Sequence, residues 1–206
     1  MTELADFVRP RGCAAVLLCL AVAGCFDEPT PAHKVVPEGA RVYLQDKGMK
    51  DLSSCTDALR PDIVDYLNLD RNQLTNVDAV ASLTGLKWLR LNDNQLSALP
   101  DLSALKGLRR IYLKNNRFTQ VPATLKSLAE LTDIDLSWND IDEIPDWLAK
   151  REGLVNLSFT HTKIMQLPED LGAWRSLKSL QLADLELNPA EMARIRKALP
   201  GTAIVF

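Results

Sequence analysis

Side chains that could bind a partner recur at fixed places in a pattern that the chain repeats. The segment LKWLRLNDNQL (86–96) has apolar residues at its first, fourth, sixth and eleventh positions, and residues 108–118 and 131–141 follow the same pattern. The positions between the apolar ones carry aromatic or charged residues, namely Tyr66, Trp88, Arg90, Arg110, Tyr112, Lys114, Asp133 and Asp135. Tyr, Trp and Arg are enriched at the energetic centres of protein interfaces. These residues are therefore the predicted partner-binding site.

Asp133 and Asp135 are also the residues that could perform acid–base chemistry. Alternate positions of one strand lie about 7 Å apart on the same face, a separation seen for the paired carboxylates of hydrolases. However, two alternating aspartates on an exposed strand are usually only solvated charge. The sequence has no H-E-x-x-H pattern, no G-x-S-x-G pattern and no phosphate-binding loop. We therefore predict a protein that is not an enzyme and that uses no cofactor and no metal.

A short strand in each repeat must hold these side chains. In the second repeat, Leu89 and Leu91 alternate with Trp88 and Arg90, which is typical of a strand with one apolar and one polar face. Asn94 then ends the strand, and its amide can bond the backbone groups of the turn. One repeat cannot bury its own apolar face, so stability must come from stacking successive repeats.

The pattern recurs every 22 or 23 residues, which indicates a solenoid. Its copies begin at Val64, Leu86, Leu108, Leu131, Leu154 and Leu177, and the last two have Thr162 and Leu185 in place of Asn. The pattern resembles L-x-x-L-x-L-x-x-N-x-L of the leucine-rich repeat family. That resemblance implies an α/β solenoid, an arc with a parallel concave sheet, short helical or 3-10 turns on the convex side and a C-terminal helical cap. It also implies that the concave face binds a protein or a ligand.

The segments on the outer side of the repeats favour short turns. Val121-Pro122 and Ile144-Pro145 follow two of the strands, and Pro fixes φ and stops a strand from continuing. Trp174 and Arg151 occupy matching apolar positions on this side. We expect Trp174 in the core, and we expect Arg151 to pack its stem while its guanidinium reaches water.

Both ends of the repeat array are predicted to be capped. Asn188 is a good N-cap, Pro189 suits the first helical position and Glu191 completes the spacing of a capping box, which together predict a helix over about 189–199. The segment AIVF (203–206) is predicted to add a final strand. At the other end, residues 42–44 predict a first edge strand.

The first 25 residues differ from the rest of the chain. Arg9 and Arg11 precede an apolar run, Cys13–Ala23, which suits the central region of a signal peptide. The run ends in Val22-Ala23-Gly24-Cys25, which resembles a bacterial lipobox. This resemblance implies cleavage before Cys25 and lipidation of its thiol.

The predicted organisation follows from these segments. Residues 1–24 are a signal peptide of the lipoprotein type, residues 25–40 are the lipidated Cys with a Pro-rich tether, and residues 41–206 are the leucine-rich repeat domain with its caps. The predicted location is the bacterial cell envelope, where a lipid anchor attaches the protein to a membrane after export.

The charge balance excludes a strongly basic protein. The 206 residues include 24 Lys and Arg against 27 Asp and Glu, a net charge of −3, so nucleic acid is not an expected partner. The expected function is that of a monomer whose concave face binds a protein or a cell-wall polymer. Two alternatives remain open at this point: a carboxylate hydrolase that acts on a cell-wall polymer, and a structural scaffold without a dedicated ligand.

Overall fold

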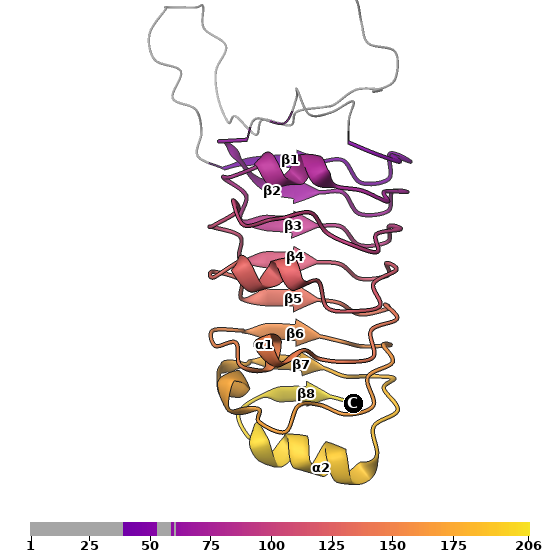
Figure 1. Cartoon of the computed structure of the whole chain (residues 1–206), viewed down its shortest axis with the longest axis vertical. Helices are drawn as coiled ribbons and strands as arrows, with labels where there is room; N and C mark the ends of the chain where they lie inside the picture. Colours follow the sequence, from indigo (N-terminus) through magenta and orange to yellow (C-terminus); the bar gives the residue numbers. More distant parts are fainter. Residues whose placement is uncertain (1–38, 53–58, 60) are drawn as a thin grey trace, which may run out of the picture.

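The computed structural model describes residues 39–52, 59 and 61–206. The predicted signal peptide, Cys25 and nearly all of the predicted tether lie outside these described residues. The strands form one sheet in chain order, each hydrogen-bonded in parallel to the next (Figure 1). They are β1 (Ala40–Tyr43), β2 (Val64–Asn68), β3 (Trp88–Arg90), β4 (Arg110–Tyr112), β5 (Asp133–Asp135), β6 (Asn156–Ser158), β7 (Ser179–Gln181) and β8 (Ala203–Val205). The predicted solenoid is confirmed, and the first strand begins two residues earlier than expected.

The apolar residues of the repeat pattern form the core. Leu67, Leu89 and Ile111 are paired across β2, β3 and β4, and each is completely buried. Because side chains alternate along a strand, the residues on either side of them point to the opposite face of the sheet. We call that outward surface, which faces away from the core, the concave face.

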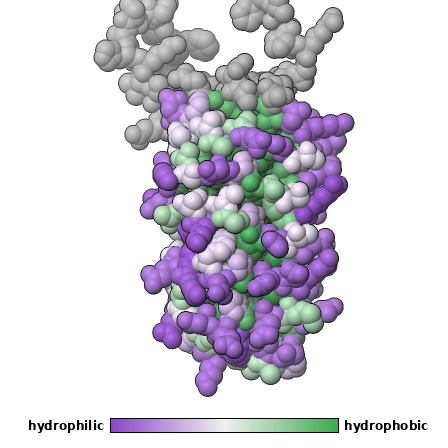
Figure 2. All heavy atoms as spheres, in the orientation of Figure 1, coloured by the Kyte–Doolittle hydropathy of each residue, from purple (hydrophilic) through white to green (hydrophobic). Residues whose placement is uncertain are grey.

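The other side of each repeat consists of short turns, as predicted. These are 3-10 helices η2 (Asp78–Ser82), η3 (Ala123–Ser127) and η4 (Gly172–Ser176), and one turn of α-helix, α1 (Asp146–Ala149). Pro122 and Pro145 directly precede η3 and α1. Figure 2, in the orientation of Figure 1, shows an apolar band along the long axis with hydrophilic residues on both sides of it.

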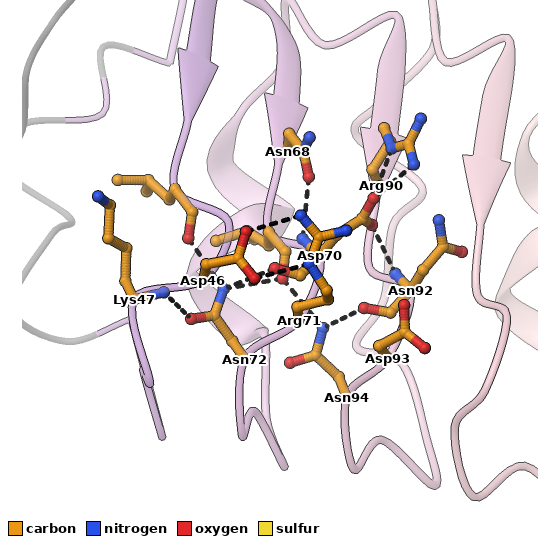
Figure 3. Close-up of polar contacts among 12 residues, drawn as sticks. Asp46, Lys47, Asn68, Asp70, Arg71, Asn72, Arg90, Asn92, Asp93 and Asn94 are labelled. Carbon is orange, nitrogen blue, oxygen red and sulfur yellow. Dashed lines mark hydrogen bonds and ion pairs between the residues drawn. The ribbon is translucent and has the colours of Figure 1, made fainter.

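The predicted asparagine ladder is present. The Asn94 side-chain amide donates to the carbonyls of Leu69 (3.0 Å), Leu91 (3.1 Å) and Asn92 (3.0 Å), and its oxygen accepts from the Leu74 N–H (3.1 Å). Figure 3 shows Asn94 beside Asn92 and Asn72, the ladder residue of the preceding repeat. The same contacts recur at the next repeats in both directions.

The ladder weakens toward the C-terminus, as the sequence predicts. Thr162 donates one bond, to the Phe159 carbonyl at 2.8 Å. Leu185, at the same position of the last repeat, offers no polar group and is packed into the core.

The residue before each of these ladder positions has a left-handed backbone. Their φ angles lie between 53° and 60°, at Asp46, Arg71, Asp93, Asn115, Trp138, His161 and Asp184. Asp, Asn and His tolerate this region better than other non-glycine residues, whereas Trp rarely adopts it. The turn of every repeat therefore has the same geometry even where its residue is unsuited to it.

The C-terminal cap differs from the prediction in one bond. Helix α2 (Pro189–Ala198) covers the last repeat, and Asn188 accepts from the Glu191 N–H at 2.8 Å as an N-cap (Figure 1). The Glu191 carboxylate does not complete a capping box. It accepts instead from the Leu167 N–H at 2.9 Å and from Arg194 at 2.7 Å, so it joins the cap to the preceding repeat.

The prediction for Arg151 was wrong. Its guanidinium donates to the carbonyls of Leu125 (3.3 Å) and Leu128 at the end of η3, and burial lowers the pKa of the group. Each of these carbonyls, near the C-terminal end of η3, accepts one backbone N–H and can accept a second bond, which explains why the guanidinium turns inward. Trp174 is fully buried as predicted, and its indole donates to the Leu148 carbonyl at 2.9 Å.

No helix among the described residues has the length and apolar character needed to span a membrane.

Candidate concave binding site

The register of the sheet brings the predicted site residues into two rows on the concave face. Tyr66, Trp88, Arg110 and Asp133 are successive partners across β2 to β5. Asn68, Arg90, Tyr112 and Asp135 form the neighbouring row. Since adjacent strands lie about 4.8 Å apart, side chains within each row are in contact range.

Four aromatic rings form a continuous line across β1 to β4, which we call the aromatic ladder. The ring centroids of Tyr43 and Tyr66 are 5.2 Å apart, those of Tyr66 and Trp88 are 4.9 Å apart, and those of Trp88 and Tyr112 are 5.8 Å apart. The last two pairs are edge-to-face, an arrangement worth about 0.5–1.5 kcal/mol per pair beyond burial. The ladder is preorganised because each ring is held by its neighbour.

Tyr43 was missed from the sequence. It pairs with Asn68 across β1 and β2, and 44% of its surface is exposed. The first strand was predicted, but it lacks the full repeat pattern and so could not be aligned with the others. The available signal was the alternation of Arg41, Val42 and Tyr43, which matches the alternation in β2.

Guanidinium groups lie over three of the rings. Arg110 is 4.9 Å from the Trp88 centroid, Arg90 is 5.6 Å from Tyr112, and Arg41, also missed from the sequence, is 6.0 Å from Tyr66. These distances are within the range of cation–π attraction. Burial raises the pKa of the Tyr66 and Tyr112 hydroxyls, so both remain neutral donors at physiological pH.

Arg90 is fixed by a buried carboxylate. Its Nε donates to Asp70 Oδ2 at 2.7 Å, and the other Asp70 oxygen accepts from the Asn92 N–H at 2.8 Å (Figure 3). The Asp70 side chain is only 3% exposed, so this carboxylate is occupied inside the protein. Arg90 therefore presents its face to Tyr112 in one orientation.

The two aspartates proposed for hydrolysis are held by neighbouring groups. Asp133 is 7% exposed, and its oxygens accept from Asn156 (2.5 Å) and from the Thr132 hydroxyl (2.6 Å). One Asp135 oxygen accepts from the Ser137 N–H and hydroxyl. A general acid or a nucleophile needs an oxygen directed at the substrate, which Asp133 does not offer. The geometry favours structural roles for both.

Across the described part of the chain, no group of three His, Cys, Asp or Glu side chains is placed to hold a metal ion. From Tyr112 to Gln181, the concave face has a shallow hollow. Its lining residues are Tyr112, Asp133, Ile134, Asp135, Asn156, Leu157, Ser158, Ser179 and Gln181.

A second aromatic contact lies at the turn position that follows the strands. The rings of Trp138 and His161 are stacked, with centroids 3.9 Å apart and planes inclined by 16°. At the same position of earlier repeats, Asn115 donates to Asp93 at 2.8 Å and Arg71 pairs with Asp46. Trp138 was missed because a lone Trp in a turn has no periodic signal. The Trp138–His161 stack is therefore another contact between neighbouring repeats at this turn position.

Comparison with known proteins gives consistent relatives. A family model described as Leucine rich repeat matches residues 84–141. Lumican from Oryctolagus cuniculus is 33% identical over 78 residues, which are 37% of this chain and 38% of lumican. Lumican from Homo sapiens is 36% identical over 78 residues, or 37% of this chain and 21% of that protein. The chain thus aligns with well under half the length of either relative.

A solved structure also resembles this fold. The crystal structure of an internalin (inlF) from Listeria monocytogenes superimposes with a TM-score of 0.63 at 23% identity, covering 73% of this chain and 46% of that one. At this identity the likeness concerns the fold alone.

Proposed function

The chain is a leucine-rich repeat protein, and on this basis we propose that its concave face binds a protein partner. The observation that carries the proposal is the aromatic ladder with guanidinium groups over its rings. Large, rigid aromatic rings contribute much contact area and lose little conformational entropy on binding. The arginines add directional donors at the same place.

The competing interpretation is that the ladder only stabilises the sheet. Cross-strand aromatic pairs do contribute to folding, and Tyr66 and Trp88 are half-buried by their neighbours. Exposed Tyr43 at the end of the ladder argues for a partner, because its solvent-facing surface gains nothing from the fold. Binding and stability measurements on the same variants separate the two.

A lipid anchor is part of the proposal. It rests on the sequence, in which Arg9 and Arg11 precede the apolar run 13–23 and a lipobox-like segment ends at Cys25. Multiple acyl chains on Cys25 would hold the repeat domain at a membrane of a bacterial cell envelope, since one chain binds only marginally. Residues 25–40 would then be the tether of a monomeric domain.

Site-specific photo-crosslinking tests where a partner binds. A benzophenone amino acid replaces Tyr112 on the concave face in one variant and Lys126 on the convex side in the other, and both full-length proteins are irradiated in cell envelopes. We expect one reproducible protein adduct from position 112 and none from position 126. An adduct formed only from position 126 would place the interface on the convex side and contradict the proposal.

A further inference from the structure

The charges on the concave face are divided between its two ends. Across β1 to β4 and the two residues that follow each strand, four cations stand against two carboxylates, a local net charge of +2 on a chain whose total is −3. The cations are Arg41, Arg90, Arg110 and Lys114, and the carboxylates are Asp65 and Asp70. Across β5 to β8 the outward charges are only Asp133 and Asp135.

Of the two carboxylates in this half, Asp65 has one oxygen buried, and Asp70 cannot meet a partner. Asp70 is 2% exposed, and its oxygens are taken by Arg90 and by the Asn92 N–H. The negative charge of Asp70 therefore serves to position Arg90. The net positive field of this half is left to the other three cations.

Those three cations are exposed and weakly paired. Arg110 has one ion pair, to Asp133, at the long distance of 3.9 Å. Arg41 and Lys114 form no ion pair with any described residue. A guanidinium stacked on a ring still directs its N–H edge outward, where it can bind a carboxylate in a bidentate manner.

We infer that the cationic half of the concave face recognises an acidic polypeptide segment, an inference that rests on the proposed function. The aromatic ladder supplies apolar contact between the cations, and Arg41, Arg110 and Lys114 supply the charge for the partner's carboxylates. Asp133 and Asp135 repel the acidic part at β5, so they fix where it ends. From β1 to β5 the distance is about 19 Å, which an extended segment of about six residues spans.

The same charges disfavour nucleic acid. A nucleic-acid site typically neutralises many phosphates in succession, whereas here three available cations are followed directly by two carboxylates. The negative total charge adds long-range repulsion of any polyanion. A short acidic stretch flanked by neutral or basic residues suits this surface better.

Selection from a displayed library of random 12-residue peptides tests the inference on the full-length protein in detergent. We expect the selected peptides to be enriched in Asp and Glu relative to the input library. A synthetic copy of the best peptide should bind at least about tenfold more weakly to the double variant Arg41→Glu, Lys114→Glu. The matched control, Lys126→Glu with Lys150→Glu on the convex side, changes the net charge equally and should leave the affinity unchanged.

The outcomes separate this inference from the function on which it rests. Peptides that require Trp88 but are neutral or basic, or that bind the Arg41→Glu, Lys114→Glu variant at full affinity, overturn the inference alone. So does a single-stranded oligonucleotide that competes as strongly as the peptide. A selection on wild type that enriches no sequence beyond a selection on Trp88→Ala contradicts the proposed function itself.

Discussion

Replacing Asn94 with Ala tests the ladder that joins the repeats, and the structure determines which groups would lose a partner. Among the three carbonyls that Asn94 bonds, Leu69 and Leu91 also accept from the ladder residues before and after it, Asn72 and Asn116. The third carbonyl, that of Asn92, also accepts a backbone N–H. Within the described part of the chain, the Leu74 N–H has no acceptor other than Asn94.

The expected loss is therefore that of one buried, unsatisfied donor, not the sum of four hydrogen bonds. Such a group costs about 1–3 kcal/mol. Asn116→Ala likewise leaves the Leu96 N–H without its acceptor, but Asn116 is more exposed than Asn94, so water can replace part of the lost bond. We expect the Asn116 loss to lie at the lower end of that range. Thr162→Ala removes a single donated bond and should cost least.

Equilibrium unfolding in urea, followed by circular dichroism, measures these losses. The exposed control Lys126→Ala should change the free energy of unfolding by no more than about 0.5 kcal/mol. Equal losses at positions 94, 116 and 162 would refute the reasoning, because they would mean that burial and the number of stranded partners do not set the cost. A change at Asn94 no larger than the control would do the same.

The remaining predictions concern the core, the cap and the anchor. Leu89→Ala should cost about 2–5 kcal/mol in urea melts, whereas Trp88→Ala, on the opposite face of β3, should cost clearly less; the reverse order would mean that the two faces are misassigned. Hydrogen bonding to Arg194 lowers the pKa of Glu191, so the cap gains stability above the ordinary pKa of 4.5 and loses it as the pH falls through the lowered value. The difference in urea midpoint between wild type and Glu191→Gln should therefore shrink on acidification from pH 7 to pH 3, and a constant difference would show that the carboxylate is not the stabilising form. Cys25→Ser should leave an unprocessed precursor with no lipid adduct, and a wild-type N-terminus found by mass spectrometry at Met1 would contradict the anchor.

The repeat pattern made much of the fold predictable. Every apolar position that recurs with it, such as Leu89 and Ile111, is buried in the core. Register follows from the same spacing, because a fixed period aligns each strand with the next, so the spacing alone predicts the row of Tyr66, Trp88 and Arg110. The sequence also predicted the weakening of the ladder at Thr162, since a hydroxyl makes fewer bonds than an amide.

The errors occurred where the repeat pattern stops or where a side chain bonds the backbone of another repeat. Tyr43 and Arg41 lie on a strand that lacks the full repeat pattern, so these residues could not be aligned with the other repeats. The guanidinium of Arg151 was predicted to reach water, and Glu191 was predicted to complete a capping box. Both predictions rested on the general preferences of these residue types. Each side chain instead bonds backbone groups of a neighbouring repeat, in contacts of more than 20 residues' separation that no local pattern encodes.

The affinity of the crosslinked partner, purified and titrated against full-length variants, tests the central claim most directly. If the concave face binds through the aromatic ladder, Trp88→Ala and Tyr112→Ala should each weaken binding by about 1–2 kcal/mol or more, roughly 5- to 30-fold, while the fold remains intact. The convex-side changes Lys126→Ala and Lys150→Ala should leave the dissociation constant unchanged. If the convex pair abolishes binding and the aromatic pair leaves it untouched, the concave face is not the binding surface.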